Sequence, residues 1–365
     1  MSERAGTDER NNQLDGLRGY AALAVVFFHG ILGIDATLID RVLTQRFFKI
    51  DGIYDRVAKI ALTVLNGHTA VAIFFILSGA VLFDSLQRER GSSLAISVKF
   101  LVKRFFRIYP ALFVCLLACW IGFNVAGIPR SANQLFENLL LYDFPINGAT
   151  WTLNVEAFGA ILLLLAFLGY RNFREAGIII VGCLFASAYL QQFNGYLIWF
   201  KPFIYSFILG MMIPTRLGKW IIGYLPAASW PVLFLGMLFA RHTIQETITA
   251  LLVGLIYYRK AGALGEFLSK PVSVFLGIIS YSLYLFNVLF LEIIQDRLRT
   301  YPMAVAHPVE FGIVAAIVII ALTIPVAYWS VRFIERPSIW LGRQLTRGRT
   351  STAVAPDNQP STPRP

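Results

Sequence analysis

Charged residues are scarce in this chain, at 15% of its 365 residues, whereas 57% are hydrophobic. A soluble domain of this length would be hard to keep in solution with such a balance. The composition therefore argues against a soluble protein and predicts an all-α polytopic membrane protein. No polar stretch is long enough to form a separate catalytic domain, so we expect any chemistry to come from the membrane segments and the loops between them.

Cysteine is also rare, with three residues in the whole chain. Cys115, Cys119 and Cys183 all lie in apolar stretches, and no histidine or acidic residue near them completes a metal-binding set. Small polarizable side chains of this kind commonly fill hydrophobic cores. We therefore predict no metal site and give the cysteines no role in chemistry.

Clear internal repeats are absent too, so nothing points to the inverted halves common in secondary transporters. The first apolar segment follows a polar stretch and lacks a small-residue cleavage site, and we expect it to act as a signal anchor. Residues 1–13 and 346–365 are too polar to contribute to a core. We predict disorder for both tails and one membrane domain over residues 14–345.

Apolar stretches close to the spanning length of about 20 residues recur along the chain. We predict about ten transmembrane helices. The segment 176–214 is the least regular, because Gly195, Lys201 and Pro202 interrupt it, and it leaves room for one span more or fewer. The predicted spans are 14–33, 69–87, 104–123, 152–170, 176–191, 198–214, 220–240, 244–258, 272–294 and 311–332.

Basic residues give the chain a net charge of +11 but do not form one patch of the kind that binds nucleic acid. They cluster in every second connection between spans, such as 88–107 and 259–270, whereas the intervening short connections hold few. Loop 34–67 mixes both signs and weakens this pattern without reversing it. By the positive-inside rule both termini face the cytoplasm, and we predict no nucleic acid partner.

Arg18 and His29 stand out in the first span. Their spacing of eleven residues is close to three full helical turns, so both lie on one helix face, roughly 16.5 Å apart along the axis. The residues between them are almost wholly apolar. Ionisable groups inside a membrane are costly and are usually retained for function, so this pair is the first candidate for chemistry.

The predicted orientation assigns each polar side chain a height in the membrane, and two layers result. A layer near the outer face contains three polar residues, His29, Glu156 and Asn287. A layer near the inner face contains three cationic residues, Arg18, Arg104 and Arg107. Guanidinium groups in the inner layer are able to bind phosphates bidentately.

Each of these residues also has a structural interpretation. A single histidine in a membrane helix can serve as a hydrogen-bonding residue, Glu156 can stabilise the N-terminus of its helix, and Asn287 can hold helices together. Each arginine alone can anchor its helix to lipid headgroups. Ser78 with Gly79 fits a packing notch, and Tyr284 fits an aromatic packing stripe.

Several segments, in order, resemble the integral-membrane acyltransferase-3 family, which modifies sugars with acyl groups. The opening LDGLRG at 14–19, followed by His29 and Gly30, is similar to the start of that family. The resemblance covers essentially the whole membrane domain. The other matching segments are FFILSG (74–79), RFFRIYP (104–110), WTLNVE (151–156), ISYSLYLFN (279–287) and FIERP (333–337).

The resemblance implies transfer of an acyl group, most often acetyl, from a cytoplasmic acyl-coenzyme A co-substrate to a glycan hydroxyl, with no bound cofactor. It implies an integral protein of the bacterial cytoplasmic membrane, with membrane lipids and a glycan or lipid-linked sugar acceptor as partners. The donor-binding residues are then the cationic inner layer, with His29 as general base and Glu156 orienting it. The acceptor side includes Asn287, Tyr284, Trp151 and Ser78.

Two positions depart from the family pattern near this acceptor side. Asn287 stands where relatives commonly have histidine, so it can only position or hydrogen-bond a group there. Ala157 follows Glu156 where relatives often have a second polar residue. A transporter or flippase that binds a passing glycan without bond making remains the alternative function, and thioester dependence distinguishes the two.

Overall fold

The structure, a computed structural model, describes residues 11–190 and 203–346. Within these ranges the regular elements are all helical, which confirms the predicted fold class. The interruption predicted at Gly195, Lys201 and Pro202 lies outside the described residues. The longer helices are α1 (Asn12–Leu32), α2 (Ile53–Val64), α3 (Gly67–Arg88), α4 (Ser93–Val125), α6 (Trp151–Phe173), α7 (Glu175–Leu190), α10 (Trp230–Phe239), α11 (His242–Tyr257), α13 (Pro271–Leu298), α15 (Pro308–Ser330) and α16 (Arg336–Thr346). The shorter elements are η1 (Ile39–Leu43), η2 (Phe47–Lys49), α5 (Ala132–Leu139), η3 (Gly148–Thr150), α8 (Ile204–Met212), α9 (Arg216–Tyr224), η5 (Ala227–Ser229), α12 (Gly262–Leu268), α14 (Pro302–Ala306) and η6 (Val331–Glu335).

Six helical segments of the described chain are long and apolar enough to cross a membrane. The predicted span 220–240 is not one helix, because Arg216–Tyr224 and Ala227–Phe239 meet at 83°. Pro226 lies at this bend and pushes Leu225 into an extended conformation, since the residue before a proline avoids the helical region. Counting the bent pair gives seven spans at most, and the predicted number of ten is not confirmed. The six segments are Asn12–Leu32, Ile53–Arg88, Ser93–Val125, Gly148–Phe173, Pro271–Leu298 and Pro308–Thr346.

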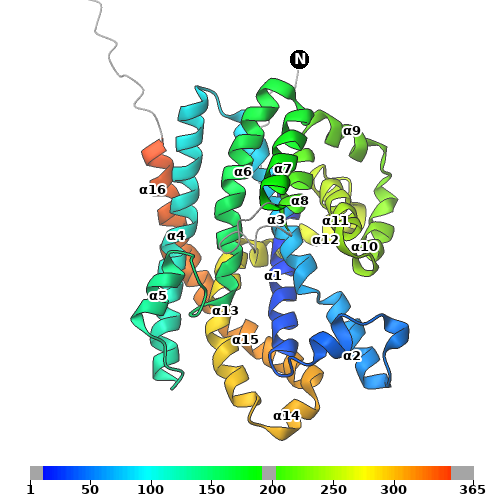
Figure 1. Ribbon diagram of the computed structural model, residues 1–365, viewed down its shortest axis with the longest axis vertical. Helices are drawn as coiled ribbons and strands as arrows, with labels where there is room; N and C mark the ends of the chain where they lie inside the picture. The colour runs from blue at the N-terminus through cyan, green and yellow to red at the C-terminus, as the bar shows by residue number, and fades with distance from the viewer. Residues whose placement is uncertain (1–10, 191–202, 347–365) are drawn as a thin grey trace, which may run out of the picture.

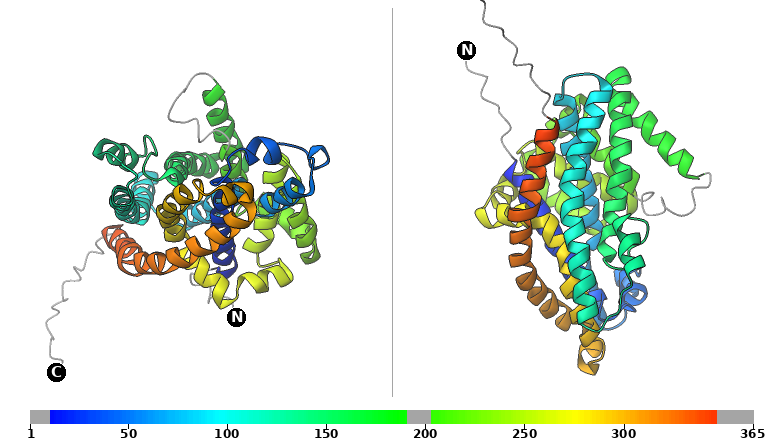
Figure 2. Two further views of the ribbon diagram at one scale, coloured as in Figure 1. Left: turned by 90° about the horizontal axis from the view of Figure 1, so that it is seen from below. Right: turned by 90° about the vertical axis from the view of Figure 1, so that its left-hand side faces the viewer.

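The connections gather at two ends of the bundle. Helices α2, α5 and α14 lie at one end, and α16 lies toward the other, near the level at which α1 begins (Figures 1 and 2). The first end carries loops predicted to face outward, and we call it the outer end. The opposite, inner end carries basic connections such as that between α3 and α4, in agreement with the charge pattern.

Helix α1 lies in the middle of the bundle, packed against α13, α15 and α3. Glycines let its backbone approach its neighbours: a Cβ on Gly19 would lie 2.7 Å from the Gly277 nitrogen, and one on Gly16 would lie 2.1 Å from the Leu268 carbonyl oxygen. Small residues permit such close packing between membrane helices. This packing fixes the rotation of α1 and therefore the direction in which Arg18 points.

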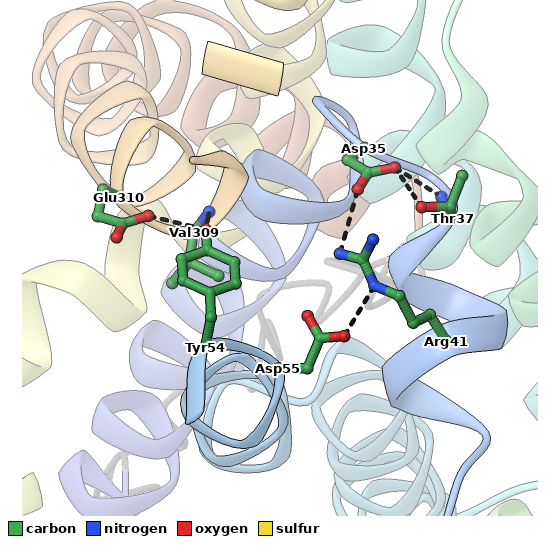
Figure 3. Close-up of polar contacts among 7 residues, drawn as sticks. All are labelled: Asp35, Thr37, Arg41, Tyr54, Asp55, Val309 and Glu310. Atoms are coloured by element: carbon green, nitrogen blue, oxygen red, sulfur yellow. Dashed lines mark hydrogen bonds and ion pairs between the residues drawn. The ribbon is translucent and has the colours of Figure 1, made fainter. Parts of the chain in front are cut away.

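The segment between α1 and α3 folds over the outer end and is tied down by polar contacts (Figure 3). Arg41 lies between two carboxylates, 3.6 Å from Asp35 and 3.0 Å from Asp55. Tyr54 on α2 donates a hydrogen bond of 2.8 Å to Glu310 at the start of α15. The Arg41 contacts hold the segment together, and the Tyr54 contact joins it to α15 of the bundle.

The segment before α6 enters the bundle instead of lying at the membrane interface. Asn138, Asn147 and Thr150 are fully buried, and their polar groups are satisfied inside. Asn138 donates to the Thr150 hydroxyl at 2.7 Å, and Asn147 donates to the Leu285 carbonyl at 2.9 Å. Helix α6 therefore begins inside the bundle, and Trp151 packs among phenylalanine rings.

Candidate active site

A cavity of about 200 Å³ lies in the middle of the bundle, enclosed by α1, α3, α4, α6 and α13. Its walls carry three arginines and one carboxylate, so the charge of the lining is positive. Five of the motif segments meet here although they are far apart in the sequence. The polar residues of the lining are Arg18, Ser78, Arg104, Arg107, Thr152, Glu156, Ser280, Tyr281 and Tyr284.

Glu156 is held in the cavity wall by two neighbours. Arg104 donates from Nη2 to Glu156 Oε2 at 3.1 Å, and Ser78 donates from Oγ to Oε1 at 3.1 Å. The arginine and glutamate side chains are only 9% and 20% exposed, so water screens the pair weakly. Glu156 is thus part of a largely buried ion pair.

Arg104 lies deeper than the sequence predicts. Helix α4 begins at Ser93, eleven residues earlier, which places Arg104 about 16.5 Å along the helix. The prediction placed Arg104 at the start of a span, yet Ile96 and Phe100 before it already belong to the buried core. The role of headgroup anchor therefore does not hold for Arg104, which is buried and paired with Glu156.

Arg18 and Arg107 present the other two guanidinium groups of the cavity. Arg18 Nη1 lies 3.9 Å from the carboxylate of Asp15, one turn earlier on α1. The Arg107 side chain is exposed and has no hydrogen bond or ion pair with any residue of 11–190 or 203–346. A guanidinium fork matches the oxygens of a phosphate, so Arg107 is available to an anionic ligand.

His29 lies closer to the outer end than this cavity does. Helices α1 and α3 run antiparallel side by side, and a Cβ on Gly67 would lie 2.6 Å from the Phe28 ring. Ser78 is eleven residues farther along α3, about 16.5 Å nearer the inner end. Because Glu156 contacts Ser78, it cannot share the layer of His29, and the predicted dyad of these two residues is not formed. The reason is that α6 begins inside the bundle.

His29 is exposed on α1. Phe28 packs against the ring edge to face. Gln295 donates to the His29 carbonyl at 2.6 Å and fixes the backbone there. Val71 is the residue of α3 that lines the outer end of the cavity. It lies one helical turn, about 6 Å, from Gly67 toward the inner end. His29 therefore lies beyond the outer end of the cavity and does not line it.

Ser78 and Tyr284 both line the cavity, as residues of a predicted site would. The Tyr284 hydroxyl donates to the Ala149 carbonyl at 3.1 Å and accepts from the Thr152 hydroxyl at 3.2 Å. Gly79, next to Ser78, faces the other way and packs against α8. Gly79 therefore provides the packing notch that the sequence predicted for Ser78 and Gly79, and the Ser78 side chain lines the cavity.

Asn287 and Trp151 do not reach the cavity wall. The Asn287 amide donates to two carbonyls of its own helix, at 3.0 Å to Leu283 and 2.6 Å to Tyr284. Bonds to its own backbone satisfy both amide hydrogens, so in this structure the residue does not join neighbouring helices or contact His29. The predicted layer of three outer polar residues is therefore not assembled.

Sequence reasoning missed Glu335. It ends the π-helical turn η6 between α15 and α16, is buried, and accepts a hydrogen bond of 2.5 Å from Ser282. Ser330 lies 2.7 Å from the same serine, and Arg107 is near enough to interact electrostatically with the carboxylate. Single π-turns are frequent at functional sites. The signal was present, because Glu335 is the acidic residue of the FIERP segment.

The described part of the chain contains no group of three histidine, cysteine or acidic side chains placed to hold a metal ion. Cys115 and Cys119 are buried core residues. The polar groups that line the cavity are the cationic, hydroxyl and carboxylate side chains described above.

A family model described as an acyltransferase domain matches residues 11–332. That range covers most of the chain and contains every residue that lines the cavity. The chain belongs to the acyltransferase-3 family. The resemblance carried by the sequence motifs is thus confirmed, and the protein is a membrane acyltransferase by family. No curated protein and no solved structure matches this acyltransferase.

Proposed function

We propose that this acyltransferase moves an acyl group, most often acetyl, from cytoplasmic acyl-CoA to a hydroxyl of a cell-surface or exported glycan. We further propose that it works in a bacterial cytoplasmic membrane. Family membership supports the reaction type. The observation that carries the rest is a cavity with three guanidinium groups in the middle of an apolar bundle, with an exposed histidine on α1 beyond the outer end of the cavity.

The donor phosphates bind at the arginines. Arg107 is the principal ligand because its guanidinium is uncommitted, and Arg18 adds a second charge beside it. Arg104 adds positive electrostatic potential at the phosphates while it remains paired with Glu156. In this scheme Glu156 keeps a buried arginine charged and oriented, instead of orienting His29, because a buried guanidinium without a counter-charge is strongly unfavourable.

The pantetheine arm then runs toward the outer end through the cavity. Arg18 and His29 lie on one face of α1, about 16.5 Å apart along the axis. The cavity residues Leu82 to Val71 cover a similar length of α3 on the facing helix. A long, slender arm held by its phosphates at one end of this path brings its thioester to the imidazole at the other.

His29 acts there as general base. The acceptor hydroxyl oxygen attacks the thioester carbonyl carbon, and its proton passes to the imidazole nitrogen. The carbon–sulfur bond breaks, the electron pair leaves with the coenzyme A sulfur, and the imidazolium returns the proton to the thiolate. An ester on the glycan and free coenzyme A result, with no net proton uptake.

Reconstituted vesicles test this function. Purified protein is placed in liposomes with the surface glycan fraction of the producing cells, and acetyl-CoA carrying an isotopic label in the acetyl group is added. We expect label to appear in glycan only when protein and thioester are both present, with the mass increase of an acetyl ester. Movement of glycan across the bilayer without thioester, and without any label in glycan, would instead establish a transporter.

A further inference from the structure

Four basic side chains gather outside the cavity, toward the outer end, and we call them the outer basic cluster. Arg241, just before α11, is near enough to Lys59 on α2 to interact with it electrostatically. His242, the first residue of α11, interacts in the same way with His68 at the start of α3. The cluster thus joins α2 and α3 to a helix that is far from them in the sequence. Its members are Lys59, His68, Arg241 and His242.

Within the described part of the chain, none of these four side chains forms an ion pair with an acidic residue. Lys59 donates from Nζ to the Leu43 carbonyl at 2.7 Å, which leaves its charge without a counter-charge. Arg241 is exposed, and its guanidinium has no hydrogen bond to a described residue. The cluster is therefore free to take an anion from outside the protein.

Two carboxylates lie one helical turn from members of the cluster, but each is committed elsewhere. Asp55, one turn before Lys59 on α2, pairs with Arg41 at 3.0 Å. Glu246, one turn after the start of α11, is buried and accepts a hydrogen bond of 2.7 Å from a serine of α8. Neither carboxylate neutralises the exposed guanidinium.

The arrangement is electrostatically unfavourable for the protein alone. The positive charges of Lys59 and Arg241 repel one another, and a basic side chain at the N-terminus of a helix opposes the helix macrodipole. Helix α11 begins without a side-chain cap, and His242 has a φ of 52°, which residues other than glycine seldom adopt. A bound anion would relieve this repulsion, so the cluster is better suited to a ligand than to holding the fold together.

The cluster lies beside His29. The Phe28 ring packs against the His29 ring with centroids 5.5 Å apart, and a Cβ on Gly67 would lie 2.6 Å from the same Phe28 ring. His68 directly follows Gly67. A chain of sugars with one hydroxyl at His29 is therefore long enough to place a neighbouring sugar at the cluster.

We propose that the outer basic cluster binds a carboxylate of the acceptor, so that this acyltransferase acts on an acidic glycan. The inference rests on the proposed function, because it takes His29 as the place where the acceptor hydroxyl reacts. Arg241 is the principal ligand, since its exposed guanidinium fork matches the two oxygens of a carboxylate. Lys59 adds charge beside it, and the two imidazoles supply hydrogen bonds. None of the four side chains takes part in bond making.

Two forms of one glycan test the proposal. The surface glycan fraction is freed of acyl esters with mild alkali and divided, and the carboxylates of one half are then converted to neutral methyl esters, which adds no hydroxyl. Wild-type protein in liposomes receives either form with labelled acetyl-CoA. We expect the KM for the methyl-esterified glycan to be about 10-fold higher, the effect of one lost charge-assisted pair. The KM for acetyl-CoA should be the same with both forms.

Substitution of Arg241 should remove this preference. Arg241→Gln should raise the KM for the unmodified glycan by about 10-fold with kcat largely kept, and should leave the KM for the methyl-esterified glycan unchanged. Arg241→Lys keeps the charge without the fork and should give an intermediate KM. Arg297→Gln is the matched control, because Arg297 is also exposed but donates to the Ala126 carbonyl after α4, on the other side of the bundle from α11 (Figure 1). It should keep the full preference for the unmodified glycan.

Three results would overturn the inference while leaving the function intact. The first is a wild-type protein with equal KM for the two glycan forms, and the second is an Arg241→Gln protein that still prefers the unmodified form by about 10-fold. The third is an equal loss of transfer to both forms in Arg241→Gln, which would assign the cluster to lipid headgroups or to folding. If Arg241→Gln is not inserted into liposomes, Arg241→Lys and the wild-type comparison still decide the matter. Failure of the wild type to transfer acetyl to either form would contradict the proposed function itself.

Discussion

The carboxylate of Glu156 lies 3.1 Å from the guanidinium of Arg104 inside the bundle, and the pair divides the cavity arginines into two kinds. Arg104 is committed to an internal partner and is almost wholly buried. Arg107, three residues later on the same helix, is exposed and has no such partner among the described residues. One arginine is thus suited to hold the site together and the other to hold a ligand.

Stability should distinguish these two arginines. Removing one member of a buried ion pair leaves an unpaired charge, so Arg104→Gln should lower the free energy of unfolding by about 3 kcal/mol. Arg107→Gln breaks no hydrogen bond or ion pair with a described residue and loses only the longer-range attraction to Glu335, so it should cost less, about 0.5 kcal/mol. Apparent melting temperatures in one detergent measure both. Equal melting temperatures for the two variants would contradict the pairing, and Arg104→Gln combined with Glu156→Gln should recover part of the loss.

Donor affinity should depend on Arg107 and Arg18. Arg107→Gln, and separately Arg18→Ala, should raise the apparent KM for acyl-CoA by about 10-fold while turnover is largely kept, because ground-state binding of the phosphates is lost. Saturation curves with acetyl-CoA provide the measurement. A fall in kcat with an unchanged KM would mean that these guanidinium groups do not bind the donor.

His29→Ala should separate chemistry from folding. The side chain is exposed and has no hydrogen bond within the described part of the chain, so the melting temperature should change little. Loss of the general base should slow acyl transfer by at least about 100-fold. His29→Gln, which keeps a polar side chain of similar size, should be equally inactive. Normal transfer by either variant would exclude His29 as the base.

Glu335 should affect donor binding through Arg107. Glu335→Gln keeps an acceptor for the Ser282 hydroxyl but removes the charge near Arg107, and should raise the KM for acyl-CoA by about 5-fold with kcat retained. Glu246→Gln is a matched control, because Glu246 is also buried and accepts from a serine, at 2.7 Å from Ser206, away from the cavity. A KM shift of equal size in both variants would show a general structural effect.

The double variant Arg107→Gln with Glu335→Gln completes this test. If Glu335 acts through Arg107, its removal should add little once the guanidinium is gone, so the two effects on KM should not multiply. Independent effects that multiply fully would mean that the carboxylate reaches the donor by another route.

The segment between α1 and α3, which folds over the outer end, should be held less firmly when Tyr54 loses its hydroxyl. Tyr54→Phe removes the bond to Glu310 and the one accepted from the Val309 N–H, at 2.8 and 3.1 Å (Figure 3). We expect a loss of about 1 kcal/mol and faster proteolysis between residues 33 and 66. Limited proteolysis in detergent measures this, with Tyr301→Phe as control, because that exposed ring lies in another connection, between α13 and α15. Unchanged proteolysis of Tyr54→Phe would show that the hydrogen bonds of Tyr54 do not hold this segment against α15.

The height of each polar side chain in the membrane was the least accurate of the predictions made from the sequence. Heights were counted from where the apolar runs begin, yet α4 begins eleven residues before Arg104, and α6 begins inside the bundle. The burial of Asn138 and Asn147 places the start of α6 inside the bundle, and no local sequence pattern predicts that burial. Glu156 therefore meets Arg104 and Ser78 instead of His29. Glu335 was overlooked for a related reason, since only the turn η6 directs it inward.

What the sequence by itself determined is the helical membrane class, the family, and the shared helix face of Arg18 and His29. Hydrophobicity and helical periodicity are local properties, so they can be counted along the chain. Tertiary structure alone decided which charges pair, because pairing depends on where each helix begins, how close glycines let it approach, and how it is rotated. The ion pair of Glu156 and Arg104 follows from those non-local contacts and from no spacing in the sequence.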